Sequence, residues 1–309
     1  MGNQHSGTNH LTSSGTRPLK ISLAIILAIM TAEVIGGILS NSLALLSDAG
    51  HMLVDALALG LSLFAMMIAR RPATPSKTYG YHRVEIMAAL TNGTILVGVS
   101  LFIFYEAYQR VLDPPVVQIP IMLLVAGIGL VANLAGILLL RKGSHRSLNI
   151  KAAFWHIIGD TVSSVGVIVA GIIIAVTGWY VVDAIIAFFI GGIILWGAVR
   201  IVREASDILL EAVPRHVQVG EVIETIKSIP GVEEIHDIHI WTITSGIHAL
   251  SAHLIIEDQM VSGSAEIVTT VNEKLAKHYN ITHTTLQLEC EACESYPSGF
   301  ICNIRQPGD

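Results

Sequence analysis

Long apolar stretches separated by short polar ones dominate the first two thirds of the chain. Six stretches have roughly the ~20 residues that an α-helix needs to cross a bilayer. They are expected at 19–39, 43–69, 86–108, 116–140, 152–176 and 181–202. Very short polar links join the first stretch to the second and the fifth to the sixth, which is typical of helical hairpins. The pattern predicts an α-helical membrane protein with six transmembrane helices.

The pattern changes after about residue 206, where the chain becomes polar. Helical periodicity is followed by two stretches that alternate like strands, a second amphipathic helix and a short third strand. We expect these elements at 214–229, 232–244, 247–257, 264–279 and 284–289. The order α-β-β-α-β predicts a small ferredoxin-like α+β domain, an antiparallel or mixed sheet covered by two helices.

Three domains are therefore expected: a flexible tail at 1–18, a six-helix transmembrane domain at 19–206 and a cytoplasmic domain at 207–309. The first 18 residues are polar and lack the apolar core of a cleavable signal peptide. Because these residues are polar, we interpret them as a mobile end of the chain.

Composition and charge agree with a membrane protein. Hydrophobic residues make up 52% of the chain and charged residues only 14%, and the mean hydropathy is +0.63. The net charge of −6 and the lack of a basic tract argue against a nucleic-acid partner. Basic residues gather at one set of segment ends, whereas Arg110 stands at the other. The positive-inside rule then places both termini in the cytoplasm, in a multi-pass protein of the cell membrane.

The second and fifth apolar segments each contain a His and an Asp four residues apart, His51 with Asp55 and His156 with Asp160. On a helix this spacing places both side chains on one face. Ionisable groups are costly in hydrocarbon and persist where they face a bundle interior and have a partner. If the two pairs face each other, two imidazole nitrogens and two carboxylate oxygens form a tetrahedral set suited to Zn²⁺. The alternative is that both His/Asp pairs only form hydrogen bonds that pack the helices. The occurrence of the same pair in two membrane segments disfavours this alternative.

Other polar residues also lie within these segments. Asp48 is one helical turn before His51 and is a candidate for a proton path or for support of the metal ligands. Glu33, Asn133 and Asp183 are interpreted as helix-packing or interfacial groups. Glycines such as those at 36 and 171 permit close helix approach.

The three cysteines lie near the C-terminus, at 290, 293 and 302. An odd, clustered set does not predict a disulfide framework. The pair Cys290 and Cys293 has the CxxC spacing of half a zinc site or of a redox pair. A metal site, a reduced inert pair and a redox pair all stay open.

Four motifs in combination resemble the cation diffusion facilitator family, and most closely its zinc/cadmium/cobalt efflux branch of bacteria. They are Ser-Asp-Ala-Gly-His-Met-Leu-Val-Asp at 47–55, Tyr-Gly-Tyr-His-Arg-Val-Glu at 79–85, His-x-x-Gly-Asp at 156–160 and His-Asp-x-His-x-Trp at 236–241. The resemblance covers residues 19 to 289. It implies a homodimer in the lipid bilayer that exports divalent metal in exchange for protons.

The resemblance assigns the central transport site to His51, Asp55, His156 and Asp160. Because some relatives have Asp in place of His51 and accept a broader range of metals, His51 favours zinc without excluding cadmium or cobalt. Manganese and iron are disfavoured because hard ions prefer oxygen ligands to imidazole. The chain has no Gly-x-x-x-x-Gly-Lys-Ser/Thr loop for ATP, so a gradient must drive transport.

The resemblance also implies metal sites outside the membrane segments. Relatives bind two zinc ions per subunit in the tail near the dimer contact, and the matching positions are His236, His253 and Glu289. His239, His248 and His283 are further candidates, and Cys290 with Cys293 would complete such a site. Relatives also have a metal site in the loop between the second and third segments. In this chain His82 is the one plausible ligand for it, and the alternative is that His82 is a solvated histidine at the membrane interface. A charge interlock in relatives corresponds to Arg83 and Glu211.

Two other classes of function compete with a transporter. An intramembrane metalloprotease would need a general base beside its metal, usually in His-Glu-x-x-His, and the sequence has no such motif. A membrane-anchored metal sensor without transport would use the His-rich tail, but it leaves the buried His/Asp pairs without a role. The sequence therefore favours a transporter over an enzyme, with the sensor as the alternative.

Overall fold

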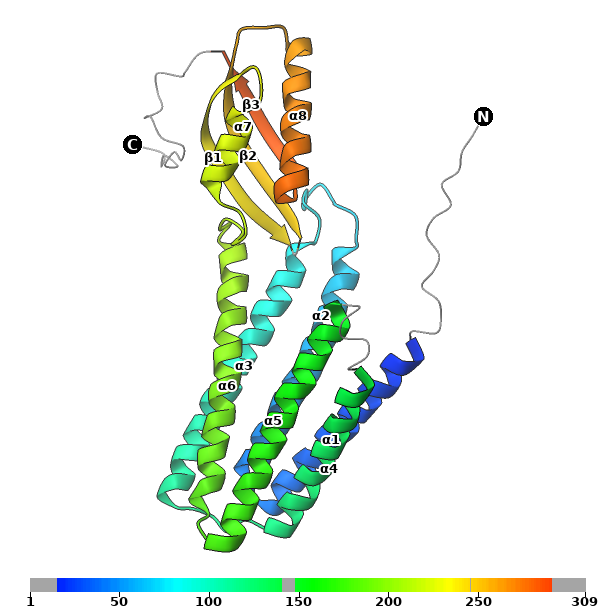
Figure 1. Ribbon diagram of the computed structural model, residues 1–309, viewed down its shortest axis with the longest axis vertical. Coiled ribbons are helices and arrows are strands. Elements are labelled where there is room, and N and C mark those ends of the chain that lie inside the picture. Colours follow the sequence, from blue (N-terminus) through cyan, green and yellow to red (C-terminus); the bar gives the residue numbers. More distant parts are fainter. Residues whose placement is uncertain (1–15, 141–147, 245, 291–309) are drawn as a thin grey trace. The chain divides into compact units, whose positions relative to one another are not determined.

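The computed structural model describes residues 16–140, 148–244 and 246–290 (Figure 1). Within the helices, it leaves out the side chains of residues 16–26 and 139–156 and of several α2 positions, 55 among them. Two compact units are present, formed by residues 1–60 with 92–200 and by 61–91 with 201–309.

Six helices take up the apolar stretches. They are α1 (Thr16–Ser40), α2 (Leu43–Ala69), α3 (Arg83–Leu112), α4 (Ile119–Leu140), α5 (Leu148–Thr177) and α6 (Val181–Leu209). The bounds of α2 match the prediction, whereas α3 and α6 run past the apolar stretches into polar sequence, because helix formation continues where hydropathy ends. In the described residues, the apolar parts of α3 to α6 are long enough to cross a membrane, and those of α1 and α2 are shorter.

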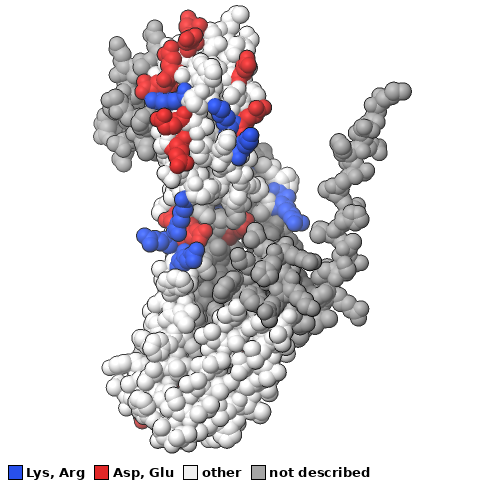
Figure 2. Space-filling model, viewed as in Figure 1, with Lys and Arg blue, Asp and Glu red and all other residues white. Residues whose placement is uncertain are grey.

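The helices of the first unit pack closely around small residues. Helix α4 packs against α1 and α5. A Cβ on Gly36 of α1 would lie 2.6 Å from the Val125 side chain, and one on Gly171 of α5 would lie 2.6 Å from Leu123. These glycines confirm the predicted packing role. On the face seen in Figure 2, the described surface of this helical part shows almost no Lys, Arg, Asp or Glu.

The C-terminal domain contains a mixed three-stranded sheet. Its elements are α7 (Val219–Lys227), β1 (Val232–Thr244), β2 (Ile247–Ile256), α8 (Val261–Tyr279) and β3 (Ile281–Glu289). The strand order is β1-β2-β3, with β1 antiparallel and β3 parallel to β2. Residues of both helices and the sheet, among them Ile226, Leu250, Leu254 and Val271, form one buried core.

Three elements of this domain begin three or more residues away from the predicted starts. Helix α7 begins at Val219 rather than at 214, because the chain from Pro214 to Gln218 forms a turn and an extended N-cap. Helix α8 begins three residues earlier than predicted, at Val261. It ends at Tyr279 and is capped by Asn280, whose left-handed backbone (φ 56°) leads directly into β3, so this strand begins at Ile281 rather than at 284.

Candidate functional site

Two predicted membrane ligands lie near a third ionisable group inside the helical unit. Asp160 of α5 is 6% exposed, and His51 of α2 is half-buried. Both interact electrostatically with Asp48, which is 2% exposed. His51 and Asp160 therefore face the same interior region between α2 and α5, as two ligands of one ion must. The side chains of Asp55 and His156 lie outside the described residues.

The first turn of α2, the helix that carries His51, is fixed by a carboxylate from another helix. Asp183 of α6 accepts hydrogen bonds from the Ser42 hydroxyl (2.6 Å) and from the backbone N–H groups of Leu43 (2.5 Å) and Ala44 (3.3 Å). The Ser42 oxygen in turn accepts the N–H of Leu45 (3.2 Å). Asp183 thus satisfies the N-terminal donors of α2 and joins it to α6, in agreement with its predicted packing role.

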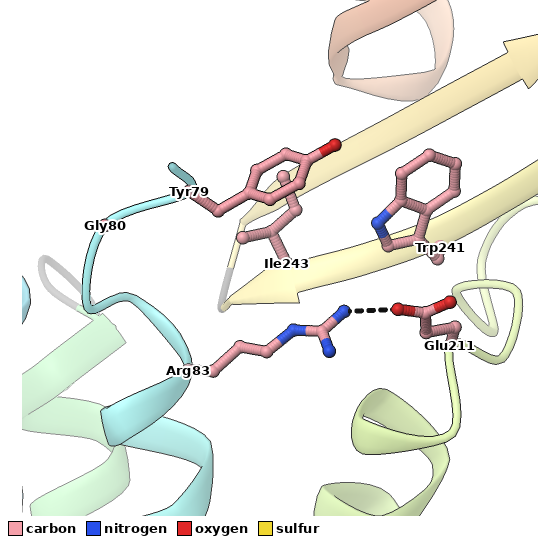
Figure 3. Close-up of a pocket in the computed structure, with 6 residues that line it drawn as sticks. All are labelled: Tyr79, Gly80, Arg83, Glu211, Trp241 and Ile243. Atoms are coloured by element: carbon pink, nitrogen blue, oxygen red, sulfur yellow. Dashed lines mark hydrogen bonds and ion pairs between the residues drawn. The ribbon is translucent and has the colours of Figure 1, made fainter. Parts of the chain in front are cut away.

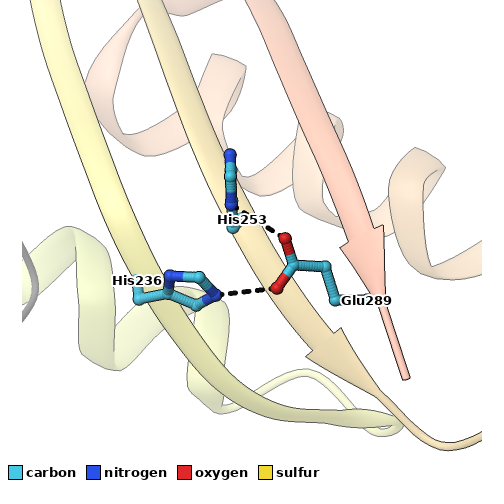
Figure 4. A group of neighbouring side chains, drawn as sticks. All are labelled: His236, His253 and Glu289. Carbon is cyan, nitrogen blue, oxygen red and sulfur yellow. Dashed lines mark hydrogen bonds and ion pairs between the residues drawn. The ribbon is translucent and has the colours of Figure 1, made fainter. Parts of the chain in front are cut away.

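Three predicted tail residues meet on the outer face of the sheet (Figure 4). The Glu289 carboxylate lies between two imidazoles, with Oε2 3.0 Å from Nε2 of His236 and Oε1 2.9 Å from Nδ1 of His253. Potential ligand atoms of the three residues lie within 4.8 Å of one another, and all three are half-buried. Two imidazole nitrogens and a carboxylate oxygen are three of the four ligands of a tetrahedral zinc site, so the residues fit this ion.

A bulge in β1 explains why the histidines of His-Asp-x-His share a face. His236 pairs with His253 and His239 pairs with Ser251, so three steps along β1 match two along β2. Asp237 within the bulge has a left-handed backbone (φ 48°). Its carboxylate lies 3.1 Å from Nε2 of His239 and 3.7 Å from Nε2 of His253. Strict alternation along β1 would place His236 and His239 on opposite faces of the sheet, so the sequence did not predict that they share a face. Asp237 was missed for the same reason, because its position depends on the bulge.

Two further candidate histidines of the tail, His248 and His283, lie outside this group. His248 accepts or donates a hydrogen bond with the Thr242 hydroxyl (3.2 Å), and its ring centroid is 5.0 Å from that of His216. Burial, with His216 as a smaller cause, lowers the pKa of His248 below its usual value, which favours a neutral ring. The ring of His283 contacts Tyr79 edge-on, with 5.6 Å between centroids.

The structure does not complete the loop site or the cysteine site. His82 belongs to no group of three potential ligands among the described side chains, and its loop neighbour Tyr81 lies under the Lys77 ammonium at 4.7 Å. Cys290 is exposed, with Sγ 3.9 Å from Oδ1 of Asp258. Cys293 lies outside the described residues. Metal binding by His82 and by the two cysteines stays a prediction.

The predicted charge pair is present in the second unit. Arg83 at the start of α3 donates to Glu211 at 2.8 Å, and both line a pocket of about 320 Å³ with Tyr79, Trp241 and Ile243 (Figure 3). Both side chains are largely exposed, so the pair adds little to stability. The Thr244 hydroxyl at the end of β1 also donates to Glu85 of α3 at 2.9 Å. The start of α3 is therefore joined to the strand that carries His236.

Apolar helices with buried ionisable groups define a membrane protein that handles ions. Residues 19–210 match the family model described as the cation efflux transmembrane domain, and residues 214–291 match that of the cation efflux protein, cytoplasmic domain. The chain therefore belongs to the cation efflux, or cation diffusion facilitator, family, as its motifs predicted.

Relatives across bacteria are similar over nearly the full chain. A "Cadmium, cobalt and zinc/H(+)-K(+) antiporter" of Bacillus subtilis is 40% identical and covers 96% of both chains. The "Metal cation efflux system protein CzcD" of Cupriavidus metallidurans is 42% identical, over 94% of this chain and 92% of its own. A solved structure of the metal-bound C-terminal domain of the CzcD transporter from that bacterium is 38% identical, with a TM-score of 0.22, and covers 24% of this chain and 99% of that one.

These comparisons decide between the predicted classes of function. The family and its named relatives are transporters, which confirms the prediction of a transporter rather than an enzyme. The sensor without transport finds no support among them. The comparisons also confirm a helical transmembrane domain followed by a cytoplasmic domain with a small sheet.

Proposed function

We propose that this protein exports Zn²⁺ from the cytoplasm in exchange for protons, with Cd²⁺ and Co²⁺ as further cargo. The observation that carries the proposal is the placement of His51 and Asp160 around Asp48 in the interior of the helical unit. With Asp55 and His156 they supply two imidazole nitrogens and two carboxylate oxygens. The names of the relatives from Bacillus subtilis and Cupriavidus metallidurans support metal efflux, and the former supports antiport.

Competition for the same atoms explains how an ion gradient drives the metal. A ligating imidazole must be neutral and a ligating carboxylate ionised, so loading zinc releases protons from the site. An unperturbed imidazole has a pKa of ~6.5 and changes charge near cellular pH. Cytosolic zinc displaces protons while the site faces inward, and protons displace zinc while it faces outward. Helices α2 and α5 must shift relative to their neighbours, since a site open to both sides would leak.

The proposed arrangement in the membrane follows from the charge pattern. We infer six spans, formed by α1 to α6, with both termini in the cytoplasm of a cell-membrane protein. The proposed domains are the tail at 1–18, the transport domain at 19–206 and a ferredoxin-like domain at 207–309. A homodimer held by the cytoplasmic domains is supported by the sheet face that carries half-buried polar residues rather than a helix layer.

Proteoliposomes test the transport proposal. Zinc added on the cytoplasmic face of the reconstituted protein is expected to enter the vesicles and to move protons outward through the protein, and both signals should saturate with zinc. A fluorescent zinc indicator and a pH indicator inside the vesicles measure the two fluxes, with protein-free vesicles as the control. Metal binding to the protein without either flux would contradict the proposal and would favour a membrane-anchored metal sensor instead.

The tail has a separate proposed role, in which His236, His253 and Glu289 hold a resident Zn²⁺, with Cys290 and Cys293 as further ligands. Metal bound there biases transport only if it binds one conformation better than another. Zinc at 100 times its Kd stabilises a folded state by about 2.7 kcal/mol.

Replacing Glu289 by alanine is expected to reduce the amount of zinc bound per full-length chain and the associated rise in melting temperature. Equilibrium dialysis and thermal unfolding in detergent measure these effects. The matched control is Glu266→Ala, which removes an exposed glutamate of α8. Equal zinc binding by the wild type and Glu289→Ala would show that the three residues hold no resident ion.

A further inference from the structure

Two histidines of the C-terminal domain meet away from the outer face of the sheet that carries His236 and His253. The ring centroids of His216 and His248 are 5.0 Å apart, with 55° between the ring planes. Neither the transport site nor the group around Glu289 uses this pair. Imidazole nitrogens are common ligands of zinc and similar divalent ions, so two rings that the fold brings together are a potential metal site.

His248 lies on the face of the sheet that the helices cover. Residues 250, 252 and 254 of β2 belong to the buried core of the domain, and His248 shares their side of the strand because side chains alternate. At this residue β2 pairs with Thr242 of β1 and with Ile281 of β3, and His248 is 6% exposed. The position of His248 is therefore fixed from both neighbouring strands.

His216 lies in the tight turn between α6 and α7. The backbone N–H of Val217 donates to the carbonyl of Pro214 at 2.9 Å, so His216 is the third residue of a β-turn. Pro214 and Val217 are buried, and Val217 is part of the domain core, whereas His216 itself is exposed. The turn is thus anchored at both ends, which holds an exposed imidazole beside the buried one of His248.

The separation of the two rings fits two ligands of one tetrahedral ion. With Zn–N bonds of about 2.0–2.1 Å and a tetrahedral angle between them, two imidazoles have ring centres about 5 Å apart. The same 5.0 Å separates the ring centroids of His236 and His253, which already fit zinc together with Glu289. An ion between His216 and His248 therefore requires no movement of the strands, and the exposed ring can rotate to direct a nitrogen at it.

The hydroxyl of Thr242 supports His248 as a ligand. It lies 3.2 Å from Nδ1 of His248. When Nε2 binds an ion, Nδ1 carries the proton and donates it to this hydroxyl in a hydrogen bond, which is the usual arrangement of a metal-binding histidine. Burial lowers the pKa of His248 and so favours the neutral ring that metal binding requires.

The surroundings leave the rest of the coordination shell to water. Among the described side chains, no third His, Cys, Asp or Glu lies close enough to form a group with this pair. Arg215, next to His216, is paired with Asp207 at 3.1 Å, so its positive charge is compensated. Two imidazoles favour Zn²⁺, Ni²⁺ or Cu²⁺ over Mg²⁺ and Ca²⁺, because the latter prefer oxygen.

We propose that His216 and His248 form a separate divalent-metal site of the C-terminal domain, in which one Zn²⁺ joins the turn after α6 to the sheet. The site shares no ligand with the transport site or with the group around Glu289, and it requires neither the proposed antiport nor the proposed resident ion. Because only two protein ligands hold the ion, it binds more weakly than at Glu289 and exchanges with zinc in solution. Its occupancy therefore follows the zinc concentration around the domain.

Equilibrium dialysis of the purified full-length protein against radioactive zinc tests the site. The background is the Asp160→Ala/Glu289→Ala double variant, which lacks one ligand of each other proposed site. Within it, His216→Ala should remove one zinc ion per chain or weaken its binding by about tenfold or more, since losing a ligand should cost at least as much as losing a residue that supports one. His278→Ala, which removes an exposed histidine of α8, is the matched control and should bind zinc as the background does.

A change of ligand shows whether residue 216 contacts the ion. With Co²⁺ in place of zinc, His216→Cys in the same background should add the absorption band of a cobalt–thiolate bond. His278→Cys should not add it, and the background itself accounts for any signal of the native cysteines. The melting temperature in detergent shows whether each variant is folded.

Two results would overturn the inference. One is that folded His216→Ala binds as much zinc as the background, or loses no more than His278→Ala does. The other is that His216→Cys adds no cobalt–thiolate band, which would leave the two rings as a packing contact. If His216→Ala does not fold, the cobalt spectrum of His216→Cys decides alone. Transport enters neither measurement, so a failure of the proposed function is seen separately, in the proteoliposome assay.

Discussion

Replacing Asp160 by alanine is expected to lower zinc transport by about 100-fold or more, with the protein still folded. Loss of residues that merely support metal ligands costs 10–100-fold in affinity or activity, and loss of a ligand should cost at least as much. Asp160 is 6% exposed on α5 and interacts with Asp48, and in the proposed function its charge compensates that of the bound dication. The initial rate of zinc uptake into proteoliposomes, measured as a function of zinc concentration, checks this.

Two companion variants show whether the effect belongs to metal binding. Asp160→Asn keeps the size of the side chain but removes its charge, so we expect a loss nearly as large as that of alanine. Asp113→Ala removes an exposed carboxylate and should transport like the wild type. If Asp160→Ala is folded and transports within about threefold of wild type, Asp160 is not a ligand of the transported ion.

The sequence predicted elements best where side-chain pattern and chain punctuation agreed. Helix α2 begins after the short polar link at 40–42, and β1 begins directly after Pro230-Gly231, so the bounds of both match the prediction. The pattern failed at α7, since apolar residues such as Val217 also fill the core from a turn. It also failed at β3, because the polar residues near the start of this strand resemble a turn, so the strand was predicted to begin too late.

Site residues were predictable where their type was unusual for their surroundings. The trio of His236, His253 and Glu289 could be named from sequence, but only the strand register shows that they meet. Asp237 could not be found in this way, because its position depends on a bulge. The bulge leaves only a weak sequence signal, the His-Asp-x-His spacing itself.

Glu33 shows a second limit of sequence reasoning. In a helix that is apolar on all sides, periodicity does not tell which face lies against the protein interior, so a single glutamate has no predictable direction. Packing supplies that direction through Gly129, a residue that is distant in sequence and ordinary in composition. The prediction of a packing group was reasonable for Asp183, whose oxygens bind donors of α2. It was incomplete for Glu33, which keeps an oxygen without a hydrogen-bond partner among the described residues.

Replacing Asp183 by alanine is expected to destabilise the protein by about 3–5 kcal/mol, because buried donors lose a charged acceptor. Asp183 is 1% exposed and accepts from the Ser42 hydroxyl and from the N–H groups of Leu43 and Ala44. No water replaces these bonds in a packed interior, so the first turn of α2 should unwind. Asp183→Asn keeps one acceptor oxygen and should cost only about 1–2 kcal/mol.

The same variant should also affect transport, because α2 carries His51 and Asp55. Thermal unfolding of the purified protein in detergent measures stability, and zinc exchange in proteoliposomes measures whether α2 still presents its ligands. We expect Asp183→Ala to lose most of its exchange at a temperature where it is still folded, with partial recovery in Asp183→Asn. A melting temperature within about one degree of wild type would show that the carboxylate does not fix the helix start. Normal exchange by a destabilised variant would instead show that the start of α2 can loosen without displacing His51, since the remainder of the helix is held by its packing against the bundle.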